Sequence, residues 1–134
     1  MKFDRSFNQR KSLFKNQLNL LINIGKLTTT LAKAKFIKGR FDKLVSKAKV
    51  NSVHVRRQLA AELSSVPAAN KLVDVIAPLF GTRTSGFTSI AKTSVRKGDG
   101  VTLATLTFME ELPKVEKKVE KKAAKKETKT TKTK

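Results

Sequence analysis

The sequence contains no cysteine, which excludes disulfide bonds and thiolate metal sites. It has a single histidine, His54, so a metal site built from several histidines is excluded as well. Its apolar runs are far shorter than the roughly 20 residues that a helix needs to span a bilayer. Residues Met1–Lys15 are polar and basic, and no cleavable apolar segment follows them. We therefore expect an intracellular protein that carries no metal or other cofactor.

Acidic residues are scarce. The 134 residues, enough for one domain, include 30 Lys and Arg against 10 Asp and Glu, a net charge of +20. Lys114–Lys134 holds ten lysines and three glutamates, or +7, so Met1–Pro113 keeps +13. A domain of that charge repels itself unless a polyanion neutralises it, and nucleic acid is the usual polyanion. The alternatives are an anionic membrane surface and a basic surface that serves solubility, although soluble domains usually carry less net charge.

The composition divides the chain into three parts. Residues 1–11 form a short basic arm, residues 12–112 a folded domain, and residues 113–134 a lysine-rich tail of low complexity. Almost nothing in the tail can be buried, so burial cannot offset the entropy of ordering and we expect disorder there. Its role is open between a non-specific basic arm and a solvated tail with no defined partner.

The first half of the domain reads as helix, short strand and helix. Ser12 fits the N-cap of a helix over 13–24, and Gly25 fits its C′ position. Lys26–Thr30 is β-branched toward its end and fits a short strand, one of whose threonines can cap the next helix. That next helix, Leu31–Lys49, has the clearest periodicity in the chain. Its apolar stripe consists of Ala34, Ile37, Phe41, Leu44, Val45 and Ala48.

A basic ridge runs along another side of the same helix. It can lie along a phosphate backbone, and the alternative for its lysines is a solvated face. Phe36 interrupts the ridge, and we favour its packing against a neighbouring element over its stacking on a base. In sequence order the ridge is Lys33, Phe36, Arg40, Lys43 and Lys47.

Two further helices are predicted. One starts at Asn51 or Ser52 and runs to about Leu63. The next starts at Pro67, a residue favoured in the first turn, and Pro78 should distort it or end it near residue 80. The apolar face of this last helix consists of Leu72, Val73, Ile76, Leu79 and Phe80.

The end of the domain reads as a β-hairpin. After the turn-rich loop Gly81–Gly86, the segments Phe87–Val95 and Val101–Met109 have the character of strands, with clear alternation in the second. Arg96–Gly100 supplies the turn between them. The resulting order, α-β-α-α-α-β-β, predicts an α+β domain of two layers, with helices packed on one face of a small sheet.

Five segments, taken in order over most of the domain, resemble the bacterial large-subunit ribosomal protein family number seventeen (bL17). They match the basic start of its first helix, the opening of its long helix, its next helix, the approach to its hairpin, and the hairpin turn. The segments are Gln9–Asn16, Thr28–Lys35, Ser52–Val53 with Arg56–Ala60, Pro78–Phe80 with Arg83 and Gly86–Ile90, and Arg96–Asp99.

The resemblance implies a cytoplasmic protein that binds large-subunit ribosomal RNA and supports assembly of the subunit. It also implies neighbouring large-subunit ribosomal proteins as partners, one copy per ribosome, and neither a small-molecule substrate nor a catalytic activity. Family members lie on the solvent side of the subunit, toward the end where the nascent chain leaves. This chain departs from the family pattern in its short arm without histidine, in Gly39, and in the tail beyond Pro113.

The candidate RNA-binding residues are the cations and one amide of the arm, the long helix, the next helix and the hairpin. Arginine and lysine supply phosphate contacts, and arginine adds two-pronged hydrogen bonds. The deep major groove of A-form RNA resists side chains, so specificity should come from the shape of the folded RNA. The candidates are Lys2, Arg5, Asn8, Arg10, Lys11, Lys15, Lys33, Lys35, Arg40, Lys43, Lys47, Arg56, Arg57, Arg83, Arg96 and Lys97.

Three other functions are weighed against this one. A nucleoid-type DNA-binding protein fits the charge, but the sequence has neither a helix-turn-helix signature nor a dimerising heptad pattern. An enzyme acting on nucleic acid would need clustered carboxylates or a nucleophile beside a base, whereas the acidic residues here are scattered. A membrane-surface protein could use the basic amphipathic helix, but its apolar stripe is better explained as core.

Overall fold

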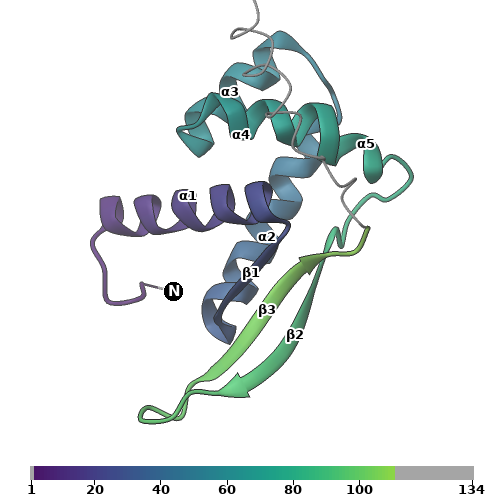
Figure 1. Ribbon diagram of the computed structural model, residues 1–134. Coiled ribbons are helices and arrows are strands. Elements are labelled where there is room, and N and C mark those ends of the chain that lie inside the picture. Colours follow the sequence, from purple (N-terminus) through teal and green to yellow (C-terminus); the bar gives the residue numbers. More distant parts are fainter. Residues whose placement is uncertain (1, 111–134) are drawn as a thin grey trace, which may run out of the picture.

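The computed structural model describes residues 2–110, and Figure 1 shows its helices beside a twisted sheet. The order of the elements confirms the predicted α+β class, with the fourth predicted helix divided into three pieces. The predicted tail, 113–134, lies outside the described residues. The elements are α1 (Phe7–Ile24), β1 (Lys26–Thr30), α2 (Leu31–Ala48), α3 (Val53–Leu63), α4 (Val66–Lys71), the π-helical turn η1 (Leu72–Ile76), α5 (Ala77–Leu79), β2 (Thr88–Val95) and β3 (Thr102–Phe108).

Helix α1 begins six residues before the predicted start. Its N-cap is Ser6, whose backbone N–H donates to Oε1 of Gln9 at 3.2 Å, and this pairing belongs to a capping box. Ser12 lies inside the helix, so its predicted role as N-cap is wrong, and residues 7–11 of the predicted arm are helical. The predicted end is confirmed: Gly25 takes φ of 85°, and its N–H donates to the Leu21 carbonyl at 2.8 Å.

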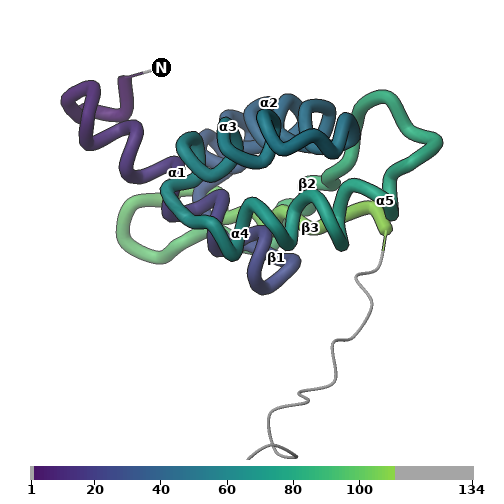
Figure 2. The backbone as a smooth tube through the Cα atoms, turned by 90° about the horizontal axis from the view of Figure 1, so that it is seen from above, coloured from purple at the N-terminus to yellow at the C-terminus, as the bar shows by residue number. Residues whose placement is uncertain are grey.

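Helix α2 is the centre of the core. Every residue of its predicted apolar stripe is buried, and Ile37, Phe41 and Val45 have no exposed surface. Helix α2 contacts all three strands of the sheet, and α1, α3 and η1 pack on it as well, so most of its buried stripe lies in one core cluster with residues from these helices. Figure 2 shows α2 among the other helices above the sheet. Among the helices of residues 2–110, none combines the length and the apolar character needed to cross a membrane.

The later helices largely follow the prediction. Ser52 caps α3, its hydroxyl accepting from the Val55 N–H at 3.2 Å. The predicted helix from Pro67 changes pitch at η1, where the Ala77 N–H donates to the carbonyl of Leu72 five residues earlier. Pro78 follows at once and has no N–H for the carbonyl four residues before it, so the wider turn lies where regular α pairing fails.

The sheet has three antiparallel strands in the order β1-β3-β2. Leu27, Ala104 and Leu106 are buried, while alternate positions on β3 carry half-buried threonines. A bulge between Lys92 and Ser94, which the sequence did not indicate, shifts the register of β2 on β3. Beyond Ile90, β2 is exposed, and the hairpin extends past the helices (Figure 1).

Candidate nucleic-acid interface

A groove lined by cations runs between α1 and α2. One part, of about 380 Å³, has Leu18 and Leu44 among its lining residues, with Glu62 of α3 beside Lys47. An adjoining part, of about 430 Å³, lies toward the N-terminus of α1, and Lys11 and Arg40 line both parts. We call the two parts together the α1–α2 groove. It brings together seven of the predicted residues: Lys2, Arg10, Lys11, Lys15, Arg40, Lys43 and Lys47.

The helical repeat explains why these cations share one groove. Lys11 and Lys15 are one turn apart on α1, while Arg40, Lys43 and Lys47 follow at intervals of three and four on α2. Of the ridge predicted on α2, Phe36, Arg40, Lys43 and Lys47 line the groove beside α1, whereas Lys33 does not. The Lys15 ammonium also donates to the Ala61 carbonyl at 3.4 Å and to the Ser64 hydroxyl, at the C-terminal end of α3.

Most cations of the groove have no acidic neighbour among residues 2–110. Across residues 2–110, no carboxylate lies within 4.0 Å of the charged nitrogens of Arg10, Lys11, Arg40 or Lys43. Lys47 differs, because its ammonium pairs with Glu62. A concentration of uncompensated positive charge between two rigid helices attracts a polyanion, whose phosphates replace the missing carboxylates.

Three predicted arginines are instead held by acidic side chains of the domain itself. Arg56 contacts Asp74 at 2.5 Å and also donates to Asn51 and Asn70. Arg83 lies 3.4 Å from Glu110. The third, Arg96, pairs with Asp99 in the hairpin turn.

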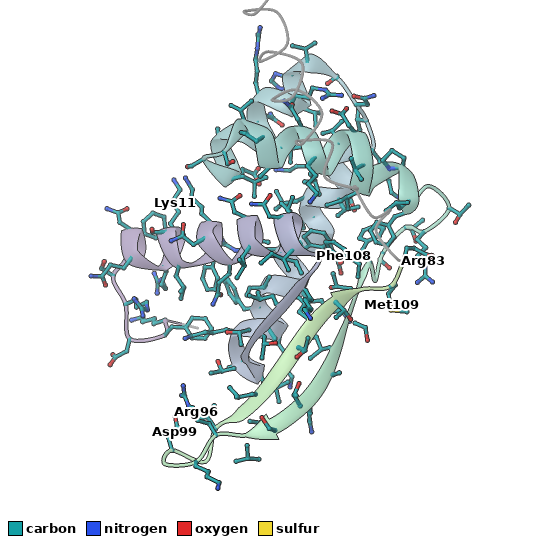
Figure 3. The ribbon with its side chains drawn as sticks, viewed as in Figure 1. Lys11, Arg83, Arg96, Asp99, Phe108 and Met109 are labelled. Atoms are coloured by element: carbon teal, nitrogen blue, oxygen red, sulfur yellow. The ribbon has the colours of Figure 1, made fainter. Side chains whose placement is uncertain are left out.

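The structure does not gather all the predicted residues in one place. Arg83 lies at one end of the β2–β3 hairpin, and Arg96 lies at the tip, at the opposite end (Figure 3). Asn8 borders a shallow depression on α1 that continues from Lys11 and Lys15. The predicted residues outside the groove are Arg5, Asn8, Lys33, Lys35, Arg56, Arg57, Arg83, Arg96 and Lys97.

The hairpin turn is closed by a two-pronged ion pair. Arg96 Nε lies 3.1 Å from Asp99 Oδ1, and its Nη2 lies 2.5 Å from Oδ2. Hydrogen bonding from Arg96 lowers the pKa of the Asp99 carboxyl, and the hydrogen bond from the Val101 N–H adds to this. Arg96 therefore shapes the turn through Asp99. Lys97 is the other cation predicted at the tip.

We predict that the Asp99 carboxyl titrates below its ordinary pKa and that Arg96→Gln raises this pKa. Because the folded-state pKa is the lower one, the ion pair stabilises the hairpin above the unfolded-state pKa, and that contribution disappears as pH falls through the folded-state value. Carboxyl-carbon NMR titration measures the shift. Asp74, whose pKa hydrogen bonding from Arg56 lowers, is the internal control and should not move in Arg96→Gln. An unchanged Asp99 midpoint in the variant would contradict the assignment.

An aromatic cluster, which the sequence analysis did not predict, supports one end of the groove. Phe14 and Phe36 stack with ring centroids 4.3 Å apart, and the Arg40 guanidinium lies over both, at 5.2 and 5.1 Å. Phe36 therefore packs against a neighbouring element, as favoured above. Phe7 lies on the same part of the groove. The sequence analysis did not predict its role, because it placed the start of the helix at residue 13 rather than at Phe7. A start at Phe7 places Phe7, Arg10, Lys11 and Phe14 at helical spacing.

Comparison with known proteins agrees with the resemblance found in the sequence. The family described as "Ribosomal protein L17" matches residues 13–109. A Campylobacter jejuni protein is 39% identical over 108 residues, covering 81% of this chain and 92% of the relative. A Thermomicrobium roseum protein is 44% identical with the same coverage, and one from Pelagibacter ubique is 34% identical over 87% of this chain and 83% of the relative. All three are named "Large ribosomal subunit protein bL17". The chain belongs to the ribosomal protein L17 family.

Proposed function

We propose that this chain is a structural constituent of the large ribosomal subunit and binds large-subunit ribosomal RNA through the α1–α2 groove. The observation that carries the proposal is the gathering of cations in the groove, most of them without a carboxylate partner in residues 2–110. The names of the relatives support the ribosomal assignment. The chain is a structural protein and not an enzyme.

The groove suits a phosphate backbone because cations project from two helices toward one channel. Lysines supply point charges, and Arg10 and Arg40 add planar guanidinium groups that can bind phosphate with two hydrogen bonds. Since α2 is fixed by its buried face, the spacing of Arg40, Lys43 and Lys47 is rigid. RNA is then selected by whether its folded backbone fits this spacing rather than by base sequence.

The other predicted cations would extend the interface. The N-terminal arm, which contains Arg5, and the turn between β2 and β3, which contains Lys97, lie toward the same end of the molecule (Figures 1 and 2), so both could meet neighbouring parts of one RNA. The division into arm, domain and tail (residues 1–11, 12–112 and 113–134) remains part of the proposal, although residues 7–11 of the arm form the first part of α1. We also propose neighbouring large-subunit proteins as partners, one copy per ribosome, and no small-molecule substrate.

Sedimentation tests this function directly. We expect the tagged protein, expressed in its own cells, to sediment with the large subunit and with full ribosomes, and to remain there after a high-salt wash. High salt weakens every phosphate contact, so retention through the wash requires a protein that is also held by its fit to the folded RNA, whereas a loosely bound polyanion binder is released. A protein that stays at the top of the sucrose gradient, or leaves the subunit at modest salt, would contradict the proposal. DNA would then be the next polyanion to test.

A further inference from the structure

The part of the α1–α2 groove nearest the N-terminus differs from the rest because aromatic rings line it together with cations. Its volume is about 430 Å³, within the range of roughly 300–1,000 Å³ that small ligands occupy. The lining combines three phenylalanines, Phe7, Phe14 and Phe36, with the side chains of Lys2, Arg10, Lys11 and Arg40. We call this part the Phe7 pocket.

Phe7 is the unusual member of this lining. The chain has eight phenylalanines, all within the described residues, and Phe7 alone is exposed, with 71% of its surface accessible. Phe14 is 2% exposed, and Phe3 and Phe36 are half-buried. A large aromatic side chain left in water beside several cations does not serve the core of the domain. It offers a free ring face at the rim of the pocket.

The inner side of the pocket is held in place by stacked groups. Phe14 and Phe36 stack on one another, Arg40 covers both rings, and Phe3 meets them edge-on with centroids 5.7 and 5.8 Å away. Phe3 and Asp4 take φ of 54° and 51°, in the left-handed region that L side chains rarely adopt. The arm therefore turns back toward α2 (Figure 1), and this turn brings Lys2 to the pocket.

These surroundings define the chemistry of a ligand. A flat, π-rich group matches the exposed ring of Phe7, and negative charge on either side of that group matches Lys2, Arg10 and Lys11. An RNA nucleotide whose base is unpaired has both features, since its base face is free and phosphates flank it. A base inside a duplex has its faces covered by its neighbours and cannot stack on Phe7.

We propose that the Phe7 pocket takes one unpaired RNA base, stacked on Phe7, with the flanking phosphates on Lys2, Arg10 and Lys11. This inference rests on the proposed RNA-binding function and makes it more specific. The rest of the groove follows a continuous backbone, while the pocket reads a bulged or looped nucleotide. Such a contact fixes the register of the RNA along the groove, which phosphate contacts alone leave free to slide.

The test uses the full chain and two RNA hairpins. One hairpin carries a single bulged nucleotide, and the other is the same hairpin without it, which we call the paired hairpin. For quenching measurements the bulged nucleotide is replaced by fluorescent 2-aminopurine. Stacking of a base on an aromatic side chain corresponds to a preference of about 5- to 150-fold. We expect the wild type to bind the bulged hairpin that much more tightly and to quench its fluorophore. Phe7→Leu should lose the preference and the quenching but keep its affinity for the paired hairpin, whereas Phe7→Trp should keep both.

Each other outcome has a definite reading. If Phe7→Leu binds and quenches like the wild type, the pocket assignment is wrong while groove binding stands. If Phe7→Leu weakens binding to both hairpins equally, Phe7 is not a base contact and the inference fails. If the wild type binds neither hairpin, and also fails to sediment with the large subunit, the proposed function fails as well. If the protein binds anionic vesicles in a way that depends on Phe7, and its affinity for the two hairpins does not differ, the pocket serves a membrane surface and the inference is overturned.

Discussion

Replacing Phe41 with alanine should lower the free energy of unfolding by about 3–5 kcal/mol, the usual cost of removing a buried phenylalanine. Phe41 has no exposed surface and stacks on Phe108 with centroids 5.2 Å apart. It connects α2 to the sheet, so its removal leaves a cavity at the joint of the two layers. Domains of this size are stable by only about 5–15 kcal/mol, so the variant should lose a large part of its stability.

Phe7→Ala is the matched control for this prediction. Both substitutions make the same chemical change in a helix, Phe7 in the first turn of α1 and Phe41 inside α2. Because Phe7 is 71% exposed, its replacement should change stability by no more than about 0.5 kcal/mol. Urea unfolding followed by far-UV circular dichroism suits a chain without tryptophan or tyrosine. Equal unfolding midpoints for the two variants would mean that Phe41 does not hold the layers together.

Phe41 also shows why the α2 helix could be predicted from sequence. Its six apolar positions repeat at intervals that fit only a helix with one buried face, and a single buried face determines both the element and its orientation. The local end signal was equally clear at Gly25, where the residue type itself supplies the conformation. The start of α3 was left between Asn51 and Ser52, two residue types that both cap helices, and the structure gives the cap to Ser52.

Elements were misplaced where two local signals competed or where none existed. Ser6 and Ser12 are both acceptable N-caps, and the capping box with Gln9 decides for Ser6. The η1 turn and the bulge between Lys92 and Ser94 each change the pairing of the backbone, and β2 is exposed around the bulge, so no apolar pattern there marks the extra residue. Periodicity locates such elements but does not reveal an extra residue within them.

The candidate site was predictable as a set of cations but not as a surface. Arg56 and Asp74 are 18 positions apart, so nothing local indicates that this arginine is held by the domain itself. Lys11 and Arg40 likewise meet only because α1 and α2 pack together. Sequence determines which side chains can bind phosphate, whereas tertiary packing determines which of them are left free to do so.

Replacing Lys11 and Lys43 together with glutamine should weaken binding to large-subunit ribosomal RNA and flatten its dependence on salt. Each lysine lines the α1–α2 groove, is exposed, and has no carboxylate within 4.0 Å in residues 2–110. Loss of one phosphate contact lowers the slope of log affinity against log salt by about 0.7–0.9, so two losses should lower it by about 1.5 units. Filter binding or fluorescence anisotropy across a salt series measures this slope.

The control is Lys26→Gln with Lys92→Gln, two exposed lysines on the sheet, outside the groove. Each pair takes the net charge from +20 to +18, so the general attraction between protein and RNA falls equally in both variants. A position-specific interface requires the slope to fall in the groove variant and to stay near the wild-type value in the sheet variant. If both slopes fall by the same amount, RNA responds to the total charge of the domain, and the arrangement of cations between α1 and α2 has no special part in binding.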